Sequence, residues 1–152
     1  MKKLISYILS SIFYFFYGSF LLFFHALQWL GFNIGGYKGH KFAVDFMNCT
    51  LSNLLYILGT RITFISKHPI PKNVPLIIVS NHQSMHDICP ISCYLKKYHP
   101  KFVSKIELGK GIPGVSYNLT HGGSVLIDRK DARQALTAIK AFGKYIEENK
   151  YT

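Results

Sequence analysis

A histidine and an aspartate five residues apart are the side chains of this sequence best suited to chemistry. His82 and Asp87 lie in the stretch NHQSMHD, directly after the apolar run 75–80. On one straight helix five residues turn by about 140°, so the two side chains would point in different directions. Across a turn from a strand into a helix they can meet.

A carboxylate that accepts the imidazole N–H fixes the tautomer of the ring. It also stabilises the imidazolium that forms when the other ring nitrogen takes a proton. The pair His82 and Asp87 is therefore a candidate for activating a hydroxyl group by general-base catalysis. The competing interpretation is a solvated loop histidine beside an aspartate that caps a helix.

The pattern of apolar residues after Gly59 predicts an α/β domain that would position this pair. Short apolar or β-branched runs between turn residues predict strands, and apolar residues at helical spacing predict helices. The predicted strands are residues 62–66, 75–80, 101–105 and 124–128, and the predicted helices are residues 87–97 and 131–148. Alternation of the two predicts a sheet flanked by helices.

The N-terminal segment is apolar enough to enter a membrane, because residues 4–37 contain no Asp, Glu, Lys or Arg. A single helix of that length would be roughly 50 Å long, which exceeds the roughly 30 Å of a hydrocarbon core. The glycines at 35–36 offer a turn, and helical spacing resumes over 40–58. We therefore expect a two-helix anchor in one leaflet over 1–58 and an α/β domain over 59–152. The alternative is a plain transmembrane tether.

The composition of the chain limits the classes of molecule that it is expected to bind. The sequence has 18 Lys+Arg against 7 Asp+Glu, a net charge of +11, and 49% hydrophobic residues. No nucleic-acid-binding motif accompanies this charge. The combination favours membrane lipids and anionic substrates over nucleic acid.

Three cysteines are present, Cys49, Cys89 and Cys93. An odd and small number gives no disulfide framework, and a zinc site would need two more ligands at suitable spacing. We expect the cysteines to be buried thiols in a reducing compartment.

Several motifs, in the right order, resemble the glycerol-phosphate and lysophosphatidate acyltransferase family. The first family motif is Asn-His-x4-Asp after a strand, and Asn81, His82 and Asp87 match it. A basic residue on the following strand is matched by Lys105. A glycine, an apolar strand and a terminal arginine are matched over 123–129. The resemblance covers nearly the whole chain and predicts an N-terminal anchor followed by an acyltransferase domain.

The resemblance implies a direct acyl transfer. His82 would deprotonate a hydroxyl of the acceptor, while Asp87 would orient and support the imidazole. The hydroxyl would attack the thioester of acyl-CoA or acyl-carrier protein, without a metal, a cofactor or an acyl-enzyme intermediate. The commonest acceptor of the family is 1-acyl-glycerol 3-phosphate, which gives phosphatidate. Glycerol 3-phosphate, another lysophospholipid and an aminoacyl-lipid remain alternatives. His86 has no implied role.

The resemblance also assigns residues to the acceptor phosphate. Arg129 would hold it, because a guanidinium donates two parallel hydrogen bonds, and Lys105 is a second candidate. Asn81 and Gly123 would support the motifs. The competing interpretations pair Arg129 with an aspartate at 128 or 131, and pair Lys105 with Glu107.

A third family motif, Glu-Gly-Thr-Arg, would follow the helix predicted over 131–148 and does not occur in the sequence. We therefore expect a C-terminally truncated family member with low or no activity. A basic surface beside the membrane and the expected lack of disulfides favour a location at the cytoplasmic face of a membrane. In a bacterium this would be the inner membrane.

Two other functions remain open. The first is a non-catalytic membrane-surface protein whose basic residues bind anionic lipid. The second is a membrane-tethered hydrolase that uses His82, although the sequence lacks the Gly-x-Ser-x-Gly turn of such enzymes.

Overall fold

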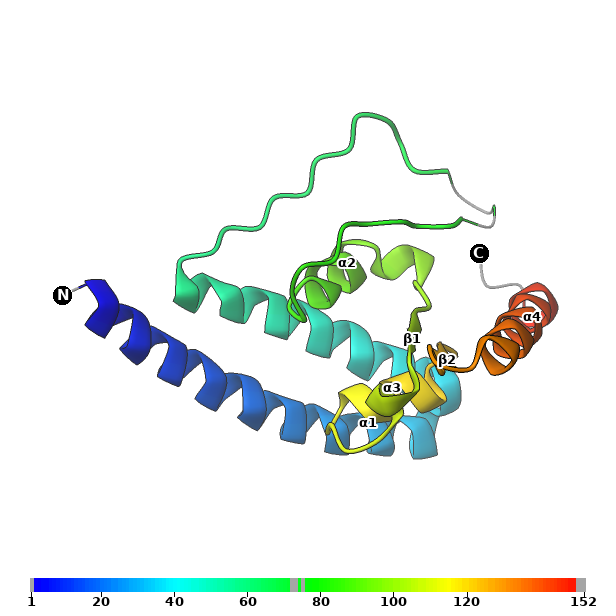
Figure 1. The fold of residues 1–152 in the computed structure, drawn as a ribbon. Helices are drawn as coiled ribbons and strands as arrows, with labels where there is room; N and C mark the ends of the chain where they lie inside the picture. The colour runs from blue at the N-terminus through cyan, green and yellow to red at the C-terminus, as the bar shows by residue number, and fades with distance from the viewer. Residues whose placement is uncertain (1, 72–73, 75, 150–152) are drawn as a thin grey trace.

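The computed structural model describes residues 2–71, 74 and 76–149 and is mostly helical (Figure 1). Its helices are α1 (Lys2–Leu54), α2 (Ile88–Tyr94), α3 (Val115–His121) and α4 (Ala132–Asn149), and its strands are β1 (Val103–Lys105) and β2 (Val125–Ile127). Short 3-10 turns cover Leu55–Leu58, Lys96–Tyr98 and Ile106–Gly109.

Helix α1 consists of two arms that meet at a sharp bend. Gly36 has φ 57° and ψ −144°, a backbone conformation that favours glycine. We call residues 2–35 the first arm and residues 37–54 the second arm. Figure 1 shows the second arm running back along the first. The chain therefore bends where the glycine pair predicted a turn.

The two arms approach closely beside the bend because both carry a glycine there. A Cβ placed on Gly31 would lie only 2.7 Å from the carbonyl oxygen of Gly39. Small residues at such a crossing let two helix backbones come together. Within the described chain, Lys3–Leu58 is the one helical stretch long and apolar enough, by length and composition, to cross a membrane.

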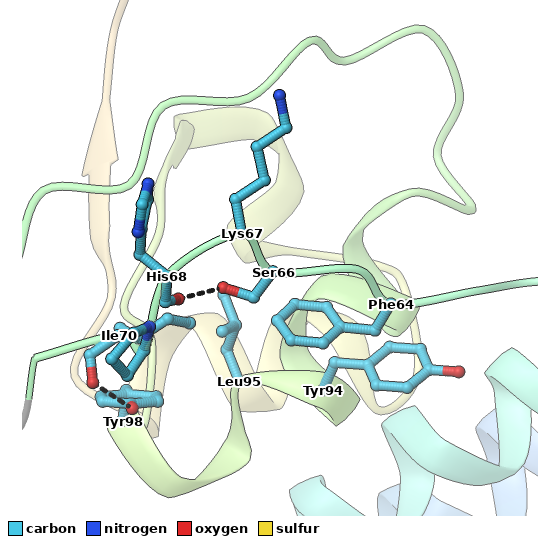
Figure 2. Close-up of a pocket in the computed structure, with 9 residues that line it drawn as sticks. Phe64, Ser66, Lys67, His68, Ile70, Tyr94, Leu95 and Tyr98 are labelled. Carbon is cyan, nitrogen blue, oxygen red and sulfur yellow. Dashed lines mark hydrogen bonds between the residues drawn. The ribbon is translucent and has the colours of Figure 1, made fainter.

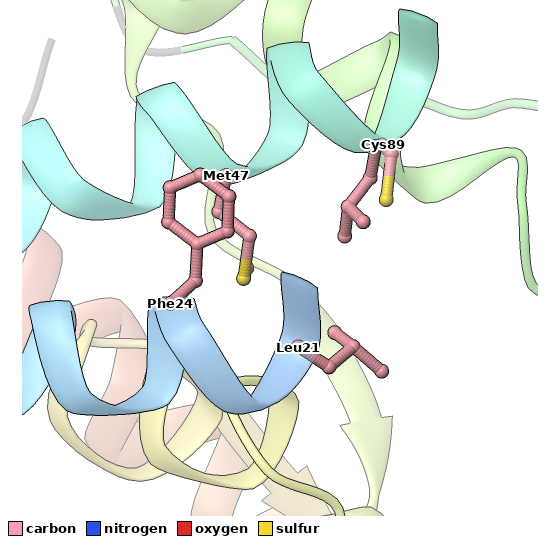
Figure 3. Packing of buried hydrophobic residues seen from close by; sticks show 5 residues of the cluster. Leu21, Phe24, Met47 and Cys89 are labelled. Carbon is pink, nitrogen blue, oxygen red and sulfur yellow. The ribbon is translucent and has the colours of Figure 1, made fainter. Parts of the chain in front are cut away.

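The main hydrophobic cluster lies between the two arms and α2 (Figure 3). Leu21 and Phe24 come from the first arm, Met47 and Leu51 from the second, and Cys89 from α2. All five are at most 8% exposed. The core is thus built on the arms rather than on a sheet.

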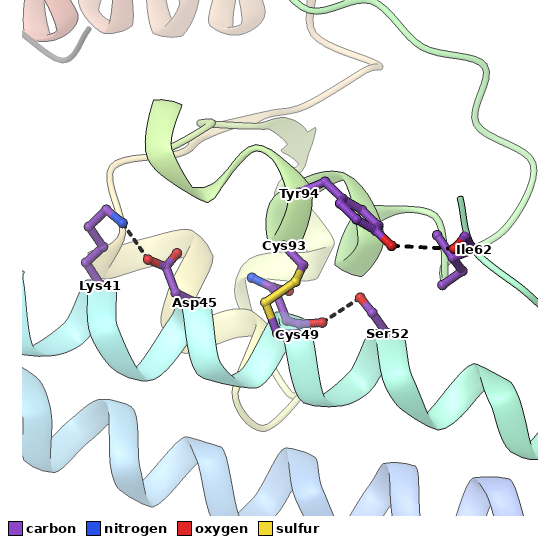
Figure 4. The surroundings of a disulfide bond; sticks show 8 residues. Lys41, Asp45, Cys49, Ser52, Ile62, Cys93 and Tyr94 are labelled. Atoms are coloured by element: carbon purple, nitrogen blue, oxygen red, sulfur yellow. Dashed lines mark hydrogen bonds and ion pairs between the residues drawn. A yellow bond between two sulfur atoms is a disulfide. The ribbon is translucent and has the colours of Figure 1, made fainter. Parts of the chain in front are cut away.

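The prediction of three free cysteines was wrong. Cys49 of the second arm and Cys93 of α2 form a disulfide (Figure 4). The two residues are 44 positions apart, and tertiary packing alone brings them together. Cys89 remains a free and buried thiol, as expected. Burial raises the pKa of this thiol to about 12, so it stays protonated at neutral pH.

The sheet is smaller than predicted. β1 and β2 pair in parallel, with Val103 opposite Val125 and Lys105 opposite Ile127. Helix α3 connects them, which gives a strand–helix–strand unit, and α4 packs on β2. The prediction of α4 was confirmed, whereas α3 was not foreseen.

The strands predicted over 62–66 and 75–80 were wrong, because the described residues of both segments are extended without sheet partners. The side chains of Ile77 and Val79 are 95% and 89% exposed. An apolar run indicates a tendency to be buried, but a strand also needs a neighbouring edge with which to pair.

We expect the disulfide to stabilise the packing of α2 on the second arm. A disulfide that closes a loop of this size typically contributes about 2–4 kcal/mol, so Cys93→Ser should lower the Tm in detergent micelles by roughly 5–15 °C. Reductant should lower the Tm of the unmodified chain and of Cys89→Ala, but not that of Cys93→Ser. An unchanged Tm of the unmodified chain under reductant would contradict the prediction.

Candidate active site

The segment that carries the candidate acid–base pair is a tight turn leading into α2. The backbone N–H of Asp87 donates to the carbonyl oxygen of Ser84 at 3.1 Å. The N–H of His86 donates to the hydroxyl oxygen of Ser84 at 3.2 Å. α2 then begins at Ile88.

The structure brings His82 and Asp87 together across this turn. Nδ1 of His82 lies 3.3 Å from Oδ2 of Asp87. The same carboxylate oxygen accepts hydrogen bonds from the backbone N–H groups of Gln83 and Ser84, each at 2.8 Å. The turn therefore holds the carboxylate through its own backbone, independently of the contact with the imidazole.

These contacts keep Asp87 ionised. The hydrogen bonds from the N–H groups of Ser84 and Gln83, followed by the bond to His82, lower the pKa of Asp87 below its usual value. The negative charge is therefore available at neutral pH to support an imidazolium. The side chain of His82 is 57% exposed, and its Nε2 is the ring nitrogen that does not face Asp87.

An apolar cavity of about 180 Å³ adjoins His82. Its wall combines both arms of α1 with the domain. The principal lining residues are Tyr17, Leu21, Met47, Leu51, His82, Ile88, Cys89, Ser104, Leu108, Ile112, Val115 and Leu119. Four of them, Leu21, Met47, Leu51 and Cys89, also belong to the core cluster shown in Figure 3. The arrangement places the imidazole of His82 beside a space suited to a hydrocarbon chain.

A second hollow, of about 390 Å³, is wider and more open (Figure 2). Phe64 stacks on Tyr94 in its wall, with ring centroids 5.4 Å apart. The hydroxyl of Tyr98 donates to the carbonyl oxygen of Ile70 at 3.1 Å. None of the predicted site residues lines this hollow, so its larger volume gives no reason to place the chemistry there.

The two candidate phosphate ligands lie at one edge of the sheet. Lys105 ends β1, and Arg129 follows the end of β2 by two residues. Both side chains are exposed. Successive residues of a strand face opposite ways. Ser104 lines the cavity, so Lys105 faces away from it.

The acidic residues proposed as partners of Arg129 are engaged elsewhere. Asp128 accepts a hydrogen bond from the backbone N–H of Lys130 at 2.8 Å. Asp131 accepts from the N–H groups of Arg133 and Gln134 at 2.9 and 3.0 Å, which caps the start of α4. Among the residues that the structure describes, neither Arg129 nor Lys105 forms an ion pair.

The two residues expected to support the motifs have different surroundings. Asn81 is exposed and lies in backbone without regular secondary structure, directly before His82. Gly123 has φ 79°, and a Cβ there would lie 3.2 Å from the ring of Tyr145. The position therefore requires glycine for the turn into β2. Over the described ranges, no group of three His, Cys, Asp or Glu side chains is placed to hold a metal ion.

Comparison with known proteins identifies the family of the chain. The family model described as Acyltransferase matches residues 61–152, which is more than half of the chain. A 1-acyl-sn-glycerol-3-phosphate acyltransferase of Helicobacter pylori is 39% identical over 77 residues. That stretch covers 49% of this chain and 30% of the relative. No solved structure matches the chain. On the family match, the chain belongs to the acyltransferase family.

Proposed function

We propose that the chain transfers a fatty acyl group from acyl-CoA or acyl-carrier protein to the free hydroxyl of 1-acyl-glycerol 3-phosphate, and so forms phosphatidate. The observation that carries the proposal is that His82, which pairs with Asp87, lines the wall of an apolar cavity. The family match and the activity named for the Helicobacter pylori relative support the same reaction.

In the proposed reaction His82 is the general base. Asp87 accepts the N–H at Nδ1, which leaves Nε2 to take the proton of the acceptor hydroxyl. The oxygen then attacks the thioester carbonyl carbon, a C–O bond forms, and the C–S bond breaks. The proton passes from His82 to the departing thiolate, and the ionised Asp87 stabilises the imidazolium in between.

The cavity is proposed to hold the part of the acyl chain next to the reacting carbonyl. An apolar cavity of about 150 Å³ holds benzene, so 180 Å³ accommodates a segment of about six carbons. The exposed His82 then lies where the polar end of the substrate leaves this space.

Arg129 is the better candidate for the acceptor phosphate. Its guanidinium is exposed, and the neighbouring Asp128 and Asp131 carboxylates are hydrogen-bonded to backbone. Arginine suits a phosphate because it donates two parallel hydrogen bonds. Lys105 is the weaker candidate, because it lies on the strand face opposite Ser104.

We further propose that residues 1–58 anchor the domain, residues 59–152, in one leaflet rather than across the bilayer. The first arm exposes large apolar side chains, among them Tyr7, Phe15, Phe23 and Trp29. Domain residues also pack on this arm from Phe13 to Phe32. A spanning orientation would carry those parts of the domain, with their polar backbone, into hydrocarbon. The Cys49–Cys93 disulfide removes the argument from reduced cysteines, so the proposed location, the cytoplasmic face of an inner membrane, rests on the acyl donors found there.

The central test is acyl transfer to 1-acyl-glycerol 3-phosphate by membranes that contain the chain. Loss of the base in His82→Ala should lower transfer about 10²–10⁴-fold, while binding to anionic liposomes stays unchanged. His68→Ala, which removes an exposed histidine outside the motif, is the matched control. Equal transfer by the unmodified chain and by His82→Ala would contradict the proposal. Liposome binding without any transfer would agree either with the non-catalytic lipid-binding function or with the low activity expected from the absent Glu-Gly-Thr-Arg motif.

The lowered pKa of Asp87 predicts how its contribution to stability varies with pH. The folded pKa lies below the reference value of 3.8, so the contribution is present above that value and is lost as the pH falls through the folded pKa. The difference in Tm between the unmodified chain and Asp87→Asn should be present at about pH 5 and above, and should shrink below about pH 4. A difference that is the same at every pH would refute the assignment.

The cavity predicts a selective effect of filling it. Leu21→Trp, inside the cavity, should lower kcat/KM for long-chain acyl donors about tenfold, because each excluded CH₂ forfeits about 0.8 kcal/mol. Leu22→Trp is the matched control, since Leu22 is 62% exposed and does not line the cavity. Equal effects of the two variants would show that the acyl chain binds elsewhere.

A further inference from the structure

His86 lies inside the motif, but the family resemblance implies no role for it. In the structure its ring packs against the first arm of α1. The centroid of the His86 ring lies 5.2 Å from that of Phe13 and 5.3 Å from that of Tyr17, with interplanar angles of 86° and 87°. Tyr14 is the third neighbour, at 6.4 Å. We call Phe13, Tyr14 and Tyr17 the aromatic clasp.

Two of the three rings of the aromatic clasp pack on each other. Phe13 is fully buried, and its ring stacks on Tyr17 with centroids 5.5 Å apart and an interplanar angle of 30°. His86 thus meets two nearly parallel rings edge-to-face, an arrangement favoured by the charge distribution of aromatic rings.

The position of His86 in the turn connects this packing to the acid–base pair. Its backbone N–H donates to the hydroxyl of Ser84, and the N–H of Ser84 donates to the carboxylate of Asp87. Asp87 is also the next residue along the chain. Holding the ring of His86 therefore holds the turn that presents the carboxylate to His82.

We propose that His86 is a positioning residue, which fastens the turn over 83–87 to the first arm and so keeps Asp87 within reach of His82. Tyr17 belongs both to the aromatic clasp and to the wall of the cavity. The same contact therefore sets the acid–base pair in register with the bound acyl chain. The catalytic meaning of this contact rests on the proposed function, whereas the structural contact does not.

The test compares His86→Ala with His86→Phe in detergent micelles. The first readout is amide hydrogen exchange at Gln83 and Ser84, whose N–H groups bond to Asp87. Exchange at both should rise about tenfold in His86→Ala and stay within about twofold of the unmodified chain in His86→Phe, because a phenyl ring can occupy the aromatic clasp. The second readout is a fall in kcat of about tenfold for His86→Ala, with the KM for the acyl donor little changed.

His121→Ala is the matched control. His121 also contacts the first arm, through Phe32 with ring centroids 5.4 Å apart, but it ends α3 and lies outside the motif. Its loss should leave exchange at Gln83 and Ser84 unchanged. Phe13→Leu alters the same contact at its first-arm partner and should raise exchange at Gln83 and Ser84 as His86→Ala does. This variant decides the question if His86→Ala does not fold.

Unchanged exchange in both His86→Ala and Phe13→Leu, or failure of His86→Phe to preserve protection, would overturn the positioning role. The expected exchange pattern, together with equal acyl transfer by the unmodified chain and by His82→Ala, would refute the proposed function and leave the positioning role intact. Transfer that depends on His82 but not on His86 would support the proposed function and refute the positioning role.

Discussion

The close packing of the two arms of α1 is the constraint on which the remaining structure depends. Gly36 reverses the chain, and Gly31 and Gly39 let the backbones meet. The two strands have three residues each, too few to bury a core by themselves. α2 and α3 consequently pack on the arms, and so does the turn over 83–87.

This arrangement explains how a polar acid–base pair can lie beside an apolar cavity. The backbone N–H groups of the turn over 83–87 are the main cause of the lowered pKa of Asp87, and burial is a smaller effect in the opposite direction. The cavity takes its apolar walls from the arms and from α2 and α3. Each half of the site can therefore be built without compromising the other, which suits a substrate with a charged end and a hydrocarbon tail.

Local patterns in the sequence predicted the features that depend on local physics. The periodicity of α4, the glycine turn and the spacing of His82 and Asp87 all carry such information. The partner of a residue in a distant segment does not. This is why the Cys49–Cys93 bond, the packing of His86 on the aromatic clasp and the missing strand partners of 62–66 and 75–80 could not be predicted. The burial of the free thiol of Cys89 could be.

The disulfide closes part of the chain into a covalent ring. It joins Cys49 to Cys93, so the exposed, extended stretch over 60–71 lies within a closed ring. Exposed segments without regular structure are the usual sites of proteolytic nicking. A single cut there opens the ring without separating the arms from the domain. The two fragments would migrate as one particle until the bond is reduced.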